Sequence, residues 1–281
     1  MQLIELRDAY RTQLESLYQK EEIDDLCKRS IFYLFEWEPI KIGLEPQYQL
    51  TPAEQIAANK VLHRLKSGEP FQYIIQQVNF CGLDLIVSSA VLIPRPETSE
   101  LVEWILENES RQPKTVFDFC TGSGCIALAL KSASPNWKLK AFDISTNAIE
   151  IAEKNAEKNK LDITCEVKDI LAWKKSKEKI DIIVSNPPYV LPSEKEKMHK
   201  NVLDFEPEIA LFVPENDPLL FYRKLFEIGT QSLKDKGKIY IEINPLYCSA
   251  LVSLGNSFGF TEFKIKKDIF GKERLLQFIL D

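Results

Sequence analysis

Histidine is scarce in this sequence, and the cysteines are scattered. Only two histidines occur among 281 residues, His63 and His199, and both lie in polar segments. The six cysteines form no Cys-x-x-Cys pair. We therefore expect no metal site, no disulfide framework and no histidine-based acid–base catalysis. Unpaired thiols are typical of a reducing compartment, which predicts a cytoplasmic protein.

Long apolar runs and an excess of basic residues are also absent. No run approaches the roughly 18 residues of a membrane span, and Glu5 and Asp8 come too early for a signal peptide. Residues 1–90 carry 9 basic and 13 acidic side chains, net −4, and residues 91–281 carry 27 and 29, net −2. A basic nucleic-acid-binding face is therefore not expected. We expect a monomer with neither a membrane nor a nucleic-acid partner.

The first part of the chain predicts helices. Apolar residues recur at helical spacing over 2–19 and 24–35. Thr51-Pro52-Ala53-Glu54 is typical of a helix start, with an N-cap, a proline in the first turn and a capping-box glutamate, and this helix should end near Lys66. Residues 1–70 are thus predicted to form a small helical domain.

Residues 71–93 change to a β-rich pattern that predicts a hairpin linker, with strands at 80–87 and 91–93. The next helix should be capped near Thr98 or Ser99.

From residue 114 onward, strand and helix patterns alternate. Strands are predicted at 115–119, 138–143, 164–168, 180–185 and 238–243, with a final β-pair at 260–266 and 274–280, and helices at 124–133, 146–159 and 218–233. Such alternation predicts an α/β domain over 94–281, with a mainly parallel sheet and helices on both faces.

Asn186-Pro187-Pro188-Tyr189 directly follows the apolar run of residues 180–185. Two prolines stop a strand, because they lack ladder donors and fix φ. A rigid turn then presents one amide and one aromatic ring. An amide cannot act as an acid or base near neutral pH, but it can bind a planar NH2 group through hydrogen bonds.

Three other loops should lie at the same edge of the sheet, because ligands bind at the carboxyl ends of parallel strands. They are Asp118 with the loop Cys120-Thr121-Gly122-Ser123-Gly124, then Asp143, then Asp169-Ile170. Gly122, Gly124 and Ala127 fit a dinucleotide-binding pattern, and Asp143 lies 19 residues past Gly124. A dehydrogenase is therefore one interpretation.

S-adenosylmethionine fits the four loops better. An acid before the glycine loop is typical of its sites, and a dehydrogenase has no use for Asn-Pro-Pro-Tyr. The glycine loop would approach the cofactor closely, and the helix after it would favour the methionine carboxylate. Asp143 would accept the ribose hydroxyls, Asp169 and Ile170 would flank the adenine, and Asp118 would orient the amino-acid part. Structural alternatives remain: Asp118 and Asp169 as caps of the following turns, and Tyr189 as a core aromatic.

Several motifs resemble one family, the release factor glutamine methyltransferases (HemK/PrmC family). They are Asn186–Tyr189, Gly68–Ile74, Val91–Thr98, Phe117–Leu130, Glu242-Ile243-Asn244 and Lys267–Arg274. The resemblance covers nearly the whole chain. It departs at Cys120 and Asn244, where the family usually has glycine. Because cysteine restricts φ, the turn at Cys120 is expected to tilt slightly.

The resemblance implies a seven-stranded class I S-adenosylmethionine-dependent (Rossmann-like) methyltransferase domain after the helical domain. It implies N5-methylation of the glutamine in the Gly-Gly-Gln motif of class I release factors, with S-adenosylhomocysteine as product and the helical domain as a docking element. In our hypothesis, Asn186 Oδ1 and the Pro187 carbonyl accept hydrogen bonds from the two amide hydrogens of the substrate glutamine. Asn186 contacts both cofactor and substrate, Pro188 belongs to the same substrate-binding turn, and Tyr189 stacks on the substrate amide. Alternatives are a ribosomal-protein glutamine methyltransferase, a DNA or RNA amino-methyltransferase, and a cofactor-binding module without catalysis.

Overall fold

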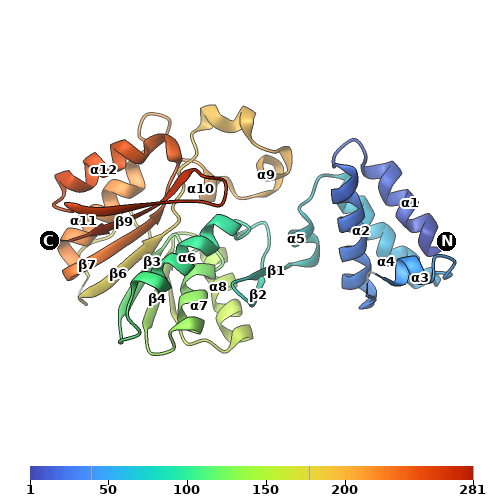
Figure 1. The fold of residues 1–281 in the computed structure, drawn as a ribbon, viewed down its shortest axis with the longest axis horizontal. Helices are drawn as coiled ribbons and strands as arrows, with labels where there is room; N and C mark the ends of the chain where they lie inside the picture. The colour runs from blue at the N-terminus through green and yellow to red at the C-terminus, as the bar shows by residue number, and fades with distance from the viewer. Residues whose placement is uncertain (39, 177, 281) are drawn as a thin grey trace. The chain divides into compact units, whose positions relative to one another are not determined.

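The computed structural model describes residues 1–38, 40–176 and 178–280. The chain folds as two compact units (Figure 1). One comprises Met1–Gln76 with His199–Phe205, and the other comprises Gln77–Met198 with the chain from Glu206 onward.

The first unit is helical. Its helices are α1 (Leu3–Leu14), α2 (Lys20–Phe35), α3 (Lys41–Leu44), α4 (Pro52–Lys66), α5 (Phe71–Ile75) and α9 (Lys200–Phe205). Leu3, Leu6, Tyr10 and Leu14 of α1 are buried at a spacing of three or four, as an amphipathic helix requires. The predicted capping box of α4 is confirmed, because the Glu54 amide donates to Thr51 Oγ1 and the Thr51 amide donates to Glu54 Oε2.

Two boundaries in this unit differ from the sequence prediction. The first helix ends at Leu14 rather than near residue 19, because the chain turns at residues 15–17 before α2 begins. Residues 71–75 form the short helix α5 instead of β structure. Phe71, Tyr73 and Ile74 are buried there, so their alternation reflects burial on a single helical turn rather than a strand.

The second unit is built on a seven-stranded sheet with the order β5-β4-β3-β6-β7-β9-β8. The strands are β3 (Thr115–Phe119), β4 (Lys138–Asp143), β5 (Thr164–Val167), β6 (Ile180–Ser185), β7 (Leu233–Glu242), β8 (Glu262–Lys267) and β9 (Glu273–Ile279). Neighbouring strands from β5 to β7 are parallel, and β9 runs antiparallel to both β7 and β8. The predicted α/β domain with a mainly parallel sheet is confirmed.

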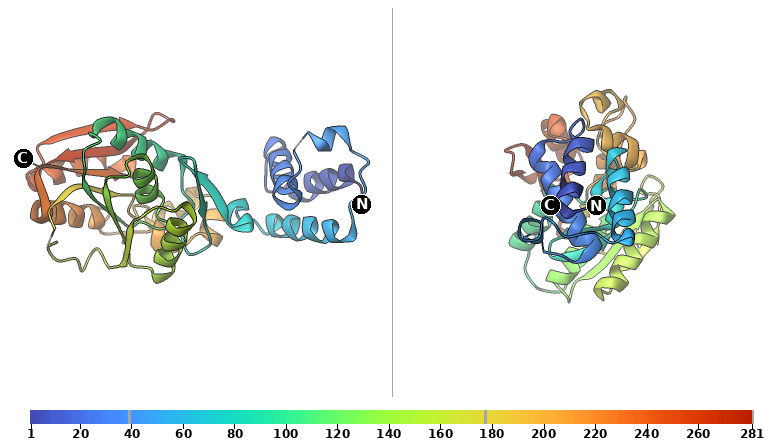
Figure 2. Two further views of the ribbon diagram at one scale, coloured as in Figure 1. Left: turned by 90° about the horizontal axis from the view of Figure 1, so that it is seen from below. Right: turned by 90° about the vertical axis from the view of Figure 1, so that its right-hand side faces the viewer.

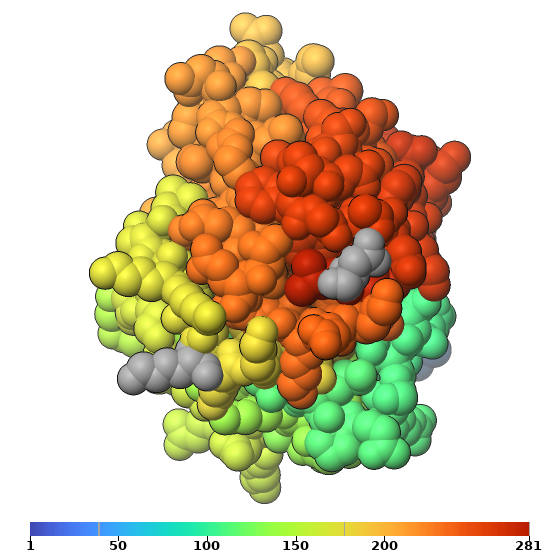
Figure 3. Space-filling view, turned by 90° about the vertical axis from the view of Figure 1, so that its left-hand side faces the viewer, coloured from blue at the N-terminus to red at the C-terminus, as the bar shows by residue number. Residues whose placement is uncertain are grey.

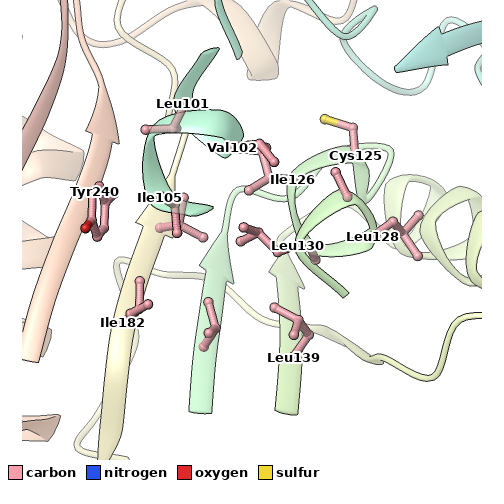
Figure 4. Packing of buried hydrophobic residues seen from close by; sticks show 14 of the residues in the cluster. Leu101, Val102, Ile105, Cys125, Ile126, Leu128, Leu130, Leu139, Ile182 and Tyr240 are labelled. Carbon is pink, nitrogen blue, oxygen red and sulfur yellow. The ribbon is translucent and has the colours of Figure 1, made fainter. Parts of the chain in front are cut away.

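Helices cover both faces of this sheet (Figures 1 and 2). On one face lie α6 (Pro96–Asn108), α7 (Cys125–Ala133) and α8 (Thr146–Asn159), and on the other lie α11 (Leu220–Ser232) and α12 (Cys248–Ser257). Successive residues of β7 alternate between the two cores, because Tyr240 packs with α6 and α7 while Ile239 and Ile241 pack with α11. Figure 4 shows side chains of α6 and α7 packed on Leu139, Ile182 and Tyr240 of the strands.

In the C-terminal third, sequence analysis missed the ten-residue helix α12 and also shorter helices such as α9. α12 follows a short 3-10 helix, Pro245–Tyr247, and buries Cys248, Leu251 and Gly255. The shorter segments are α10 (Glu208–Leu211) and the 3-10 helix Pro192–Lys197. Figure 3 shows the face of this unit on which residues of the C-terminal third, in orange and red, gather. Among the described residues, no helix is both long enough and apolar enough to cross a membrane.

The predicted hairpin exists, but its strands are β1 (Gln77–Phe80) and β2 (Leu83–Ile86). Residues 91–93 are not a strand, although Val91 and Ile93 are buried. The buried side chain of Asn155, on α8, holds the hairpin in place. Asn155 accepts from the Ile86 amide at 2.6 Å and donates to the carbonyls of Ile86 and Ser123 at 3.0 and 2.9 Å. One side chain therefore joins the hairpin to the glycine loop.

Candidate active site

The register of the sheet places four polar residues in one row. Phe119 pairs with Phe142 on β4 and with Ser185 on β6, and Ser185 pairs with Ile241 on β7. The next residue of each strand or loop is Cys120, Asp143, Asn186 and Glu242. Because these strands are parallel, all four residues lie at the carboxyl edge, where ligands bind in such sheets.

Three residues of the glycine loop between β3 and α7 have the left-handed backbone conformation. Cys120, Gly122 and Gly124 have φ values of 59°, 55° and 80°. A Cβ on Gly122 would meet open space, whereas a Cβ on Gly124 would lie 3.1 Å from the Cβ of Ala152 on α8. Gly122 therefore leaves room on the outer side of the loop, and Gly124 permits close packing of α7 on α8.

Cys120 adopts the left-handed conformation that glycine adopts without cost. The left-handed region costs a non-glycine residue about 1–2 kcal/mol. Burial raises the pKa of the Cys120 thiol well above its usual range, and the nearby carboxylates of Asp143 and Asp118 raise it further. The thiol is consequently uncharged and suited to packing rather than to nucleophilic chemistry.

Asp143 is held by the backbone on both sides. Its Oδ2 accepts from the Gly122 amide and its Oδ1 accepts from the Ser145 amide, each at 2.9 Å. Burial raises the pKa of this carboxyl, and the two amides act in the opposite direction. The N-cap of α8 is Ser145, whose hydroxyl accepts from the Ala148 amide, so Asp143 is not needed as a cap.

Asp169 has the capping contact that the sequence left open. Its Oδ1 accepts from the Leu171 amide at 2.8 Å, two residues on. Both Asp169 and Ile170 nevertheless line the cavity described below. Asp169 therefore shapes its own loop and also presents a carboxylate to the cavity.

The Asn-Pro-Pro-Tyr turn is bonded to its surroundings at both ends. Asn186 Nδ2 donates to Thr98 Oγ1 at 3.2 Å, and the Tyr189 hydroxyl donates to Glu242 Oε1 at 2.9 Å. Thr98 donates to the other oxygen of Glu242 at 2.7 Å. The side chain of Asn244, the second departure from glycine, donates to the Tyr189 carbonyl and to Glu194. The turn is thus fixed from α6, from β7 and from the loop after β7.

Thr98 has a different role from the predicted one. The helix α6 begins at Pro96, with Arg95 as its N-cap residue, so neither Thr98 nor Ser99 caps it. Pro96 fits the first position because proline lacks the amide that would be unpaired there. Thr98 then lies inside the first turn, where its hydroxyl is free to bind Glu242.

Asp118 is completely buried and does not line the cavity. Its Oδ2 accepts from the Thr121 hydroxyl at 2.6 Å, while its Oδ1 has no hydrogen-bond partner among the described residues. Burial raises the pKa of this carboxyl to about 7, and the Thr121 hydroxyl lowers it by less. Asp118 thus binds the start of the glycine loop through Thr121, and its role toward the amino-acid part of the cofactor stays a prediction.

A largely apolar cavity opens at this edge of the sheet. Of the residues predicted for the site, nine line it: Cys120, Thr121, Gly122, Ser123, Asp143, Asp169, Ile170, Asn186 and Pro188. Four others do not: Asp118, Gly124, Pro187 and Tyr189. The Tyr189 ring packs beside the core instead, with its hydroxyl on Glu242. The stacking of Tyr189 on a substrate amide stays a prediction.

Sequence reasoning missed the walls that come from distant segments. Leu92, Pro94 and Arg95 arrive from the segment after the hairpin, and Ile209, Ala210 and Phe221 from the region before and within α11. It also missed the Thr98–Glu242 pair. Glu242 could have been found, because an acid that ends a central parallel strand belongs to the ligand-binding edge. No group of three or more His, Cys, Asp or Glu side chains in the described part of the chain is arranged to hold a metal ion.

Two family models match the chain. The PrmC N-terminal domain matches residues 5–75, and the methyltransferase small domain matches residues 97–204. Among solved structures, a methyltransferase from Pyrococcus furiosus has a TM-score of 0.53 at 20% identity, over 70% of this chain and 89% of that one. The fold is accordingly the class I S-adenosylmethionine-dependent methyltransferase fold, as the resemblance implied.

Curated relatives match over nearly the full length. The release factor glutamine methyltransferase of Flavobacterium psychrophilum is 41% identical over 95% of this chain and 97% of its own length. That of Bacteroides thetaiotaomicron is 39% identical over 95% of this chain and 96% of its own length. The protein belongs to the release factor glutamine methyltransferase family.

Proposed function

We propose that this protein transfers the methyl group of S-adenosylmethionine to the N5 amide nitrogen of the glutamine in the Gly-Gly-Gln motif of class I release factors. The observation that carries the proposal is Asn186. Among the described residues it is the one side-chain amide in the cavity wall, and it follows β6 in a proline-fixed turn, level with Asp143. Membership of the family supports the choice of a protein glutamine as acceptor.

The residues of the cavity fit S-adenosylmethionine. Each carboxylate oxygen of Asp143 accepts one hydrogen bond from a backbone amide. Each oxygen therefore keeps a lone pair that can accept from a ribose hydroxyl. Ser123 lines the cavity, and its buried hydroxyl has no hydrogen-bond partner among the described residues. A buried hydroxyl without a partner costs free energy, so a polar ligand group there would stabilise it. Ile144, Ile170 and Leu171 provide apolar walls for an adenine ring.

S-adenosylmethionine, when bound, supplies a methyl group on a sulfonium, which is already a good electrophile. The acceptor is a poor nucleophile, because an amide nitrogen shares its lone pair with its carbonyl. In our proposal, Asn186 Oδ1 and the Pro187 carbonyl accept the two hydrogens of the glutamine amide and direct its nitrogen to the methyl group. The nitrogen–carbon bond forms as the sulfur–carbon bond breaks. The amide nitrogen then loses one proton, which passes to solvent as the products leave the cavity.

The chain's contribution is therefore positioning and fixed dipoles rather than acid–base chemistry. Holding a reactant in the productive orientation removes a large entropic part of the barrier. Carbonyl oxygens aimed at the nitrogen favour the positive charge that develops there. The apolar cavity wall excludes water, which strengthens both effects.

The helical unit is proposed to help dock the release factor. Large apolar side chains of this unit are exposed, among them Phe32 of α2, Leu44 of α3 and Ile56 of α4. Isolated exposed apolar residues are common, so the family match of residues 5–75 is what favours a docking role. In the variant Ile56→Glu, we expect a higher KM for the release factor and unchanged affinity for S-adenosylmethionine.

The direct test is a labelling experiment. The protein and methyl-labelled S-adenosylmethionine are incubated with a class I release factor, the same factor with its motif glutamine replaced, ribosomal proteins, and DNA. We expect label only on the intact release factor. Label on a ribosomal protein or on DNA instead would overturn the proposed substrate.

Two variants test the assigned roles. For Asn186→Ala we expect a loss of kcat of about 100-fold or more, with little change in affinity for S-adenosylmethionine. The matched control is Asn256→Ala at an exposed position of α12, which should be fully active. For Asp143→Ala we expect weaker S-adenosylmethionine binding by calorimetry, and an unchanged dissociation constant would reject the ribose role.

A further inference from the structure

The side chain of Asn186 has two ends of nearly the same shape but opposite hydrogen-bonding character. One end is an acceptor oxygen and the other an NH2 donor. The proposed function, on which this inference rests, needs the oxygen toward the substrate amide. Nothing in the covalent structure of asparagine selects that orientation, so the neighbours of Asn186 must select it.

Thr98 is the neighbour that contacts the buried end of this amide. Its Oγ1 lies 3.2 Å from Asn186 Nδ2 and 2.7 Å from Glu242 Oε2. Thr98 itself is buried, with 2% of its surface exposed. A hydroxyl has one proton to donate, so its use in one bond determines what the other bond can be.

The Thr98 hydroxyl donates its proton in a hydrogen bond to Glu242. Its two carboxyl oxygens receive the hydroxyls of Thr98 and Tyr189, at 2.7 and 2.9 Å. Burial raises the pKa of the Glu242 carboxyl, while the two hydroxyls and then the positive charge of Arg274 lower it. Both oxygens of Glu242 face hydroxyl groups that donate to them, so the carboxyl group acts as an acceptor at both ends.

The remaining bond is then determined. Because the proton of Thr98 Oγ1 points to Glu242, this oxygen can only accept a hydrogen bond from Asn186. Only the NH2 end of Asn186 can donate one. Rotating the amide by 180° would set oxygen against oxygen and leave buried groups unpaired, at a cost of about 1–3 kcal/mol. That difference corresponds to roughly a 5- to 150-fold preference for one orientation.

We propose that Thr98 and Glu242 are positioning residues that set the orientation of the Asn186 amide, so that its oxygen faces the substrate. Tyr189 belongs to the same device, because its hydroxyl binds the second oxygen of Glu242. The carboxylate thus holds the Asn-Pro-Pro-Tyr turn at its last residue directly, and at its first residue through Thr98.

The first test removes the hydroxyl without changing the shape. Thr98→Val should lower kcat about 10- to 100-fold, while the dissociation constant of S-adenosylmethionine stays within about threefold, since the apolar walls and Asp143 are untouched. Thr98→Ser keeps the hydroxyl and should restore kcat to within about threefold of the wild type. Wild-type kcat in Thr98→Val would overturn the inference. Thr98→Ala serves as the second variant should the valine fail to fold.

A double-mutant cycle separates positioning from general stability. Residues that act through one another show non-additive effects. In the Asn186→Ala background there is no amide to orient, so Thr98→Val should cause no further loss of kcat. A further loss equal to that in the wild-type background would mean that Thr98 acts by another route.

Hydrogen exchange tests the orientation without any turnover. The side-chain NH2 of Asn186, identified in nitrogen-15 spectra by its absence from Asn186→Ala, should exchange slowly in the wild type and at least about tenfold faster in Thr98→Val. Equal exchange in the two proteins overturns the inference, even if release factors are methylated. Slow, Thr98-dependent exchange in a protein that labels no glutamine would instead reject the proposed function and retain the orientation.

Discussion

The buried carboxyl of Asp118 gives the sharpest test of the electrostatics of this site. It is fully buried, one of its oxygens has no hydrogen-bond partner among the described residues, and burial raises its pKa to about 7 from an ordinary value of 3.8. Asp118→Asn keeps the shape and can still accept from the Thr121 hydroxyl, but it carries no charge at any pH. Comparing the two proteins across pH isolates the cost of burying the charge.

The sign follows from proton linkage. Because the folded pKa lies above the unfolded one, the folded state binds the proton more tightly. The stabilisation is complete below about pH 4, falls as pH rises toward 7, and is lost above it. Each unit of pKa is worth about 1.4 kcal/mol, so about three units correspond to roughly 4 kcal/mol in all. Between pH 5 and 8, where about two units remain, Asp118→Asn should gain roughly 3 kcal/mol on the wild type.

Urea unfolding followed by tryptophan fluorescence at pH 5, 6, 7 and 8 measures this difference. Three of the four tryptophans, Trp104, Trp137 and Trp173, lie in the second unit, so the fluorescence signal reports mainly on the unfolding of that unit. Glu242 also has a raised pKa, but it is common to both proteins and cancels in the comparison. The charge of Asp143 is one cause of the raised pKa of Asp118 and is part of the effect measured. Asp162→Asn, at an exposed position, is the control and should follow the wild type. If the curves for Asp118→Asn and the wild type are parallel from pH 5 to 8, the reasoning is refuted.

Three further predictions concern the free energy of unfolding, each checked by urea unfolding. Gly124→Ala should lower it by about 2–3 kcal/mol, because the added Cβ crowds α8 and the φ is left-handed. The control Gly259→Ala has a similar φ but open space around the Cβ, so it should lose only about 1 kcal/mol. Equal losses in the two variants would contradict the packing role of Gly124. Cys120→Gly should be about 1 kcal/mol more stable than Cys120→Ala, since both remove the thiol but only glycine relieves the left-handed strain; the reverse order would contradict that strain. Thr51→Ala should destabilise the helical unit by about 1 kcal/mol and Thr51→Ser by much less. Equal stability of Thr51→Ala and the wild type would show that the capping box does not stabilise this unit.

The sequence predicted the central strands closely, for a physical reason. β3, β4 and β6 have the predicted bounds, 115–119, 138–143 and 180–185. β3 and β6 are largely buried and read as short apolar-rich runs, whereas β4 begins with alternating polar and apolar residues. Each of the three strands stops at a polar or proline-containing loop. The same loops carry most of the site, so finding the strand ends also located nine of the residues that line the cavity.

What the sequence could not predict depends on long-range contacts. Val91 and Ile93 are buried by packing without any ladder of hydrogen bonds, and a β-rich pattern cannot distinguish these cases. Thr98 and Glu242 are 144 residues apart, so their bond exists only in the folded chain. The bond between the Tyr189 hydroxyl and Glu242 on β7 likewise joins residues 53 positions apart in the chain.

The amide of Asn155 makes the glycine loop and the hairpin a single thermodynamic element. Because one side chain bonds both Ile86 and Ser123, neither segment can move away without breaking bonds to the other. A ligand that orders the glycine loop should then also shift the opening equilibrium of the hairpin toward the closed form, and linkage requires the reverse effect on ligand affinity to be of equal free energy. We therefore expect a change that destabilises the hairpin, such as Asn155→Ala, also to weaken the binding of any ligand that orders the glycine loop.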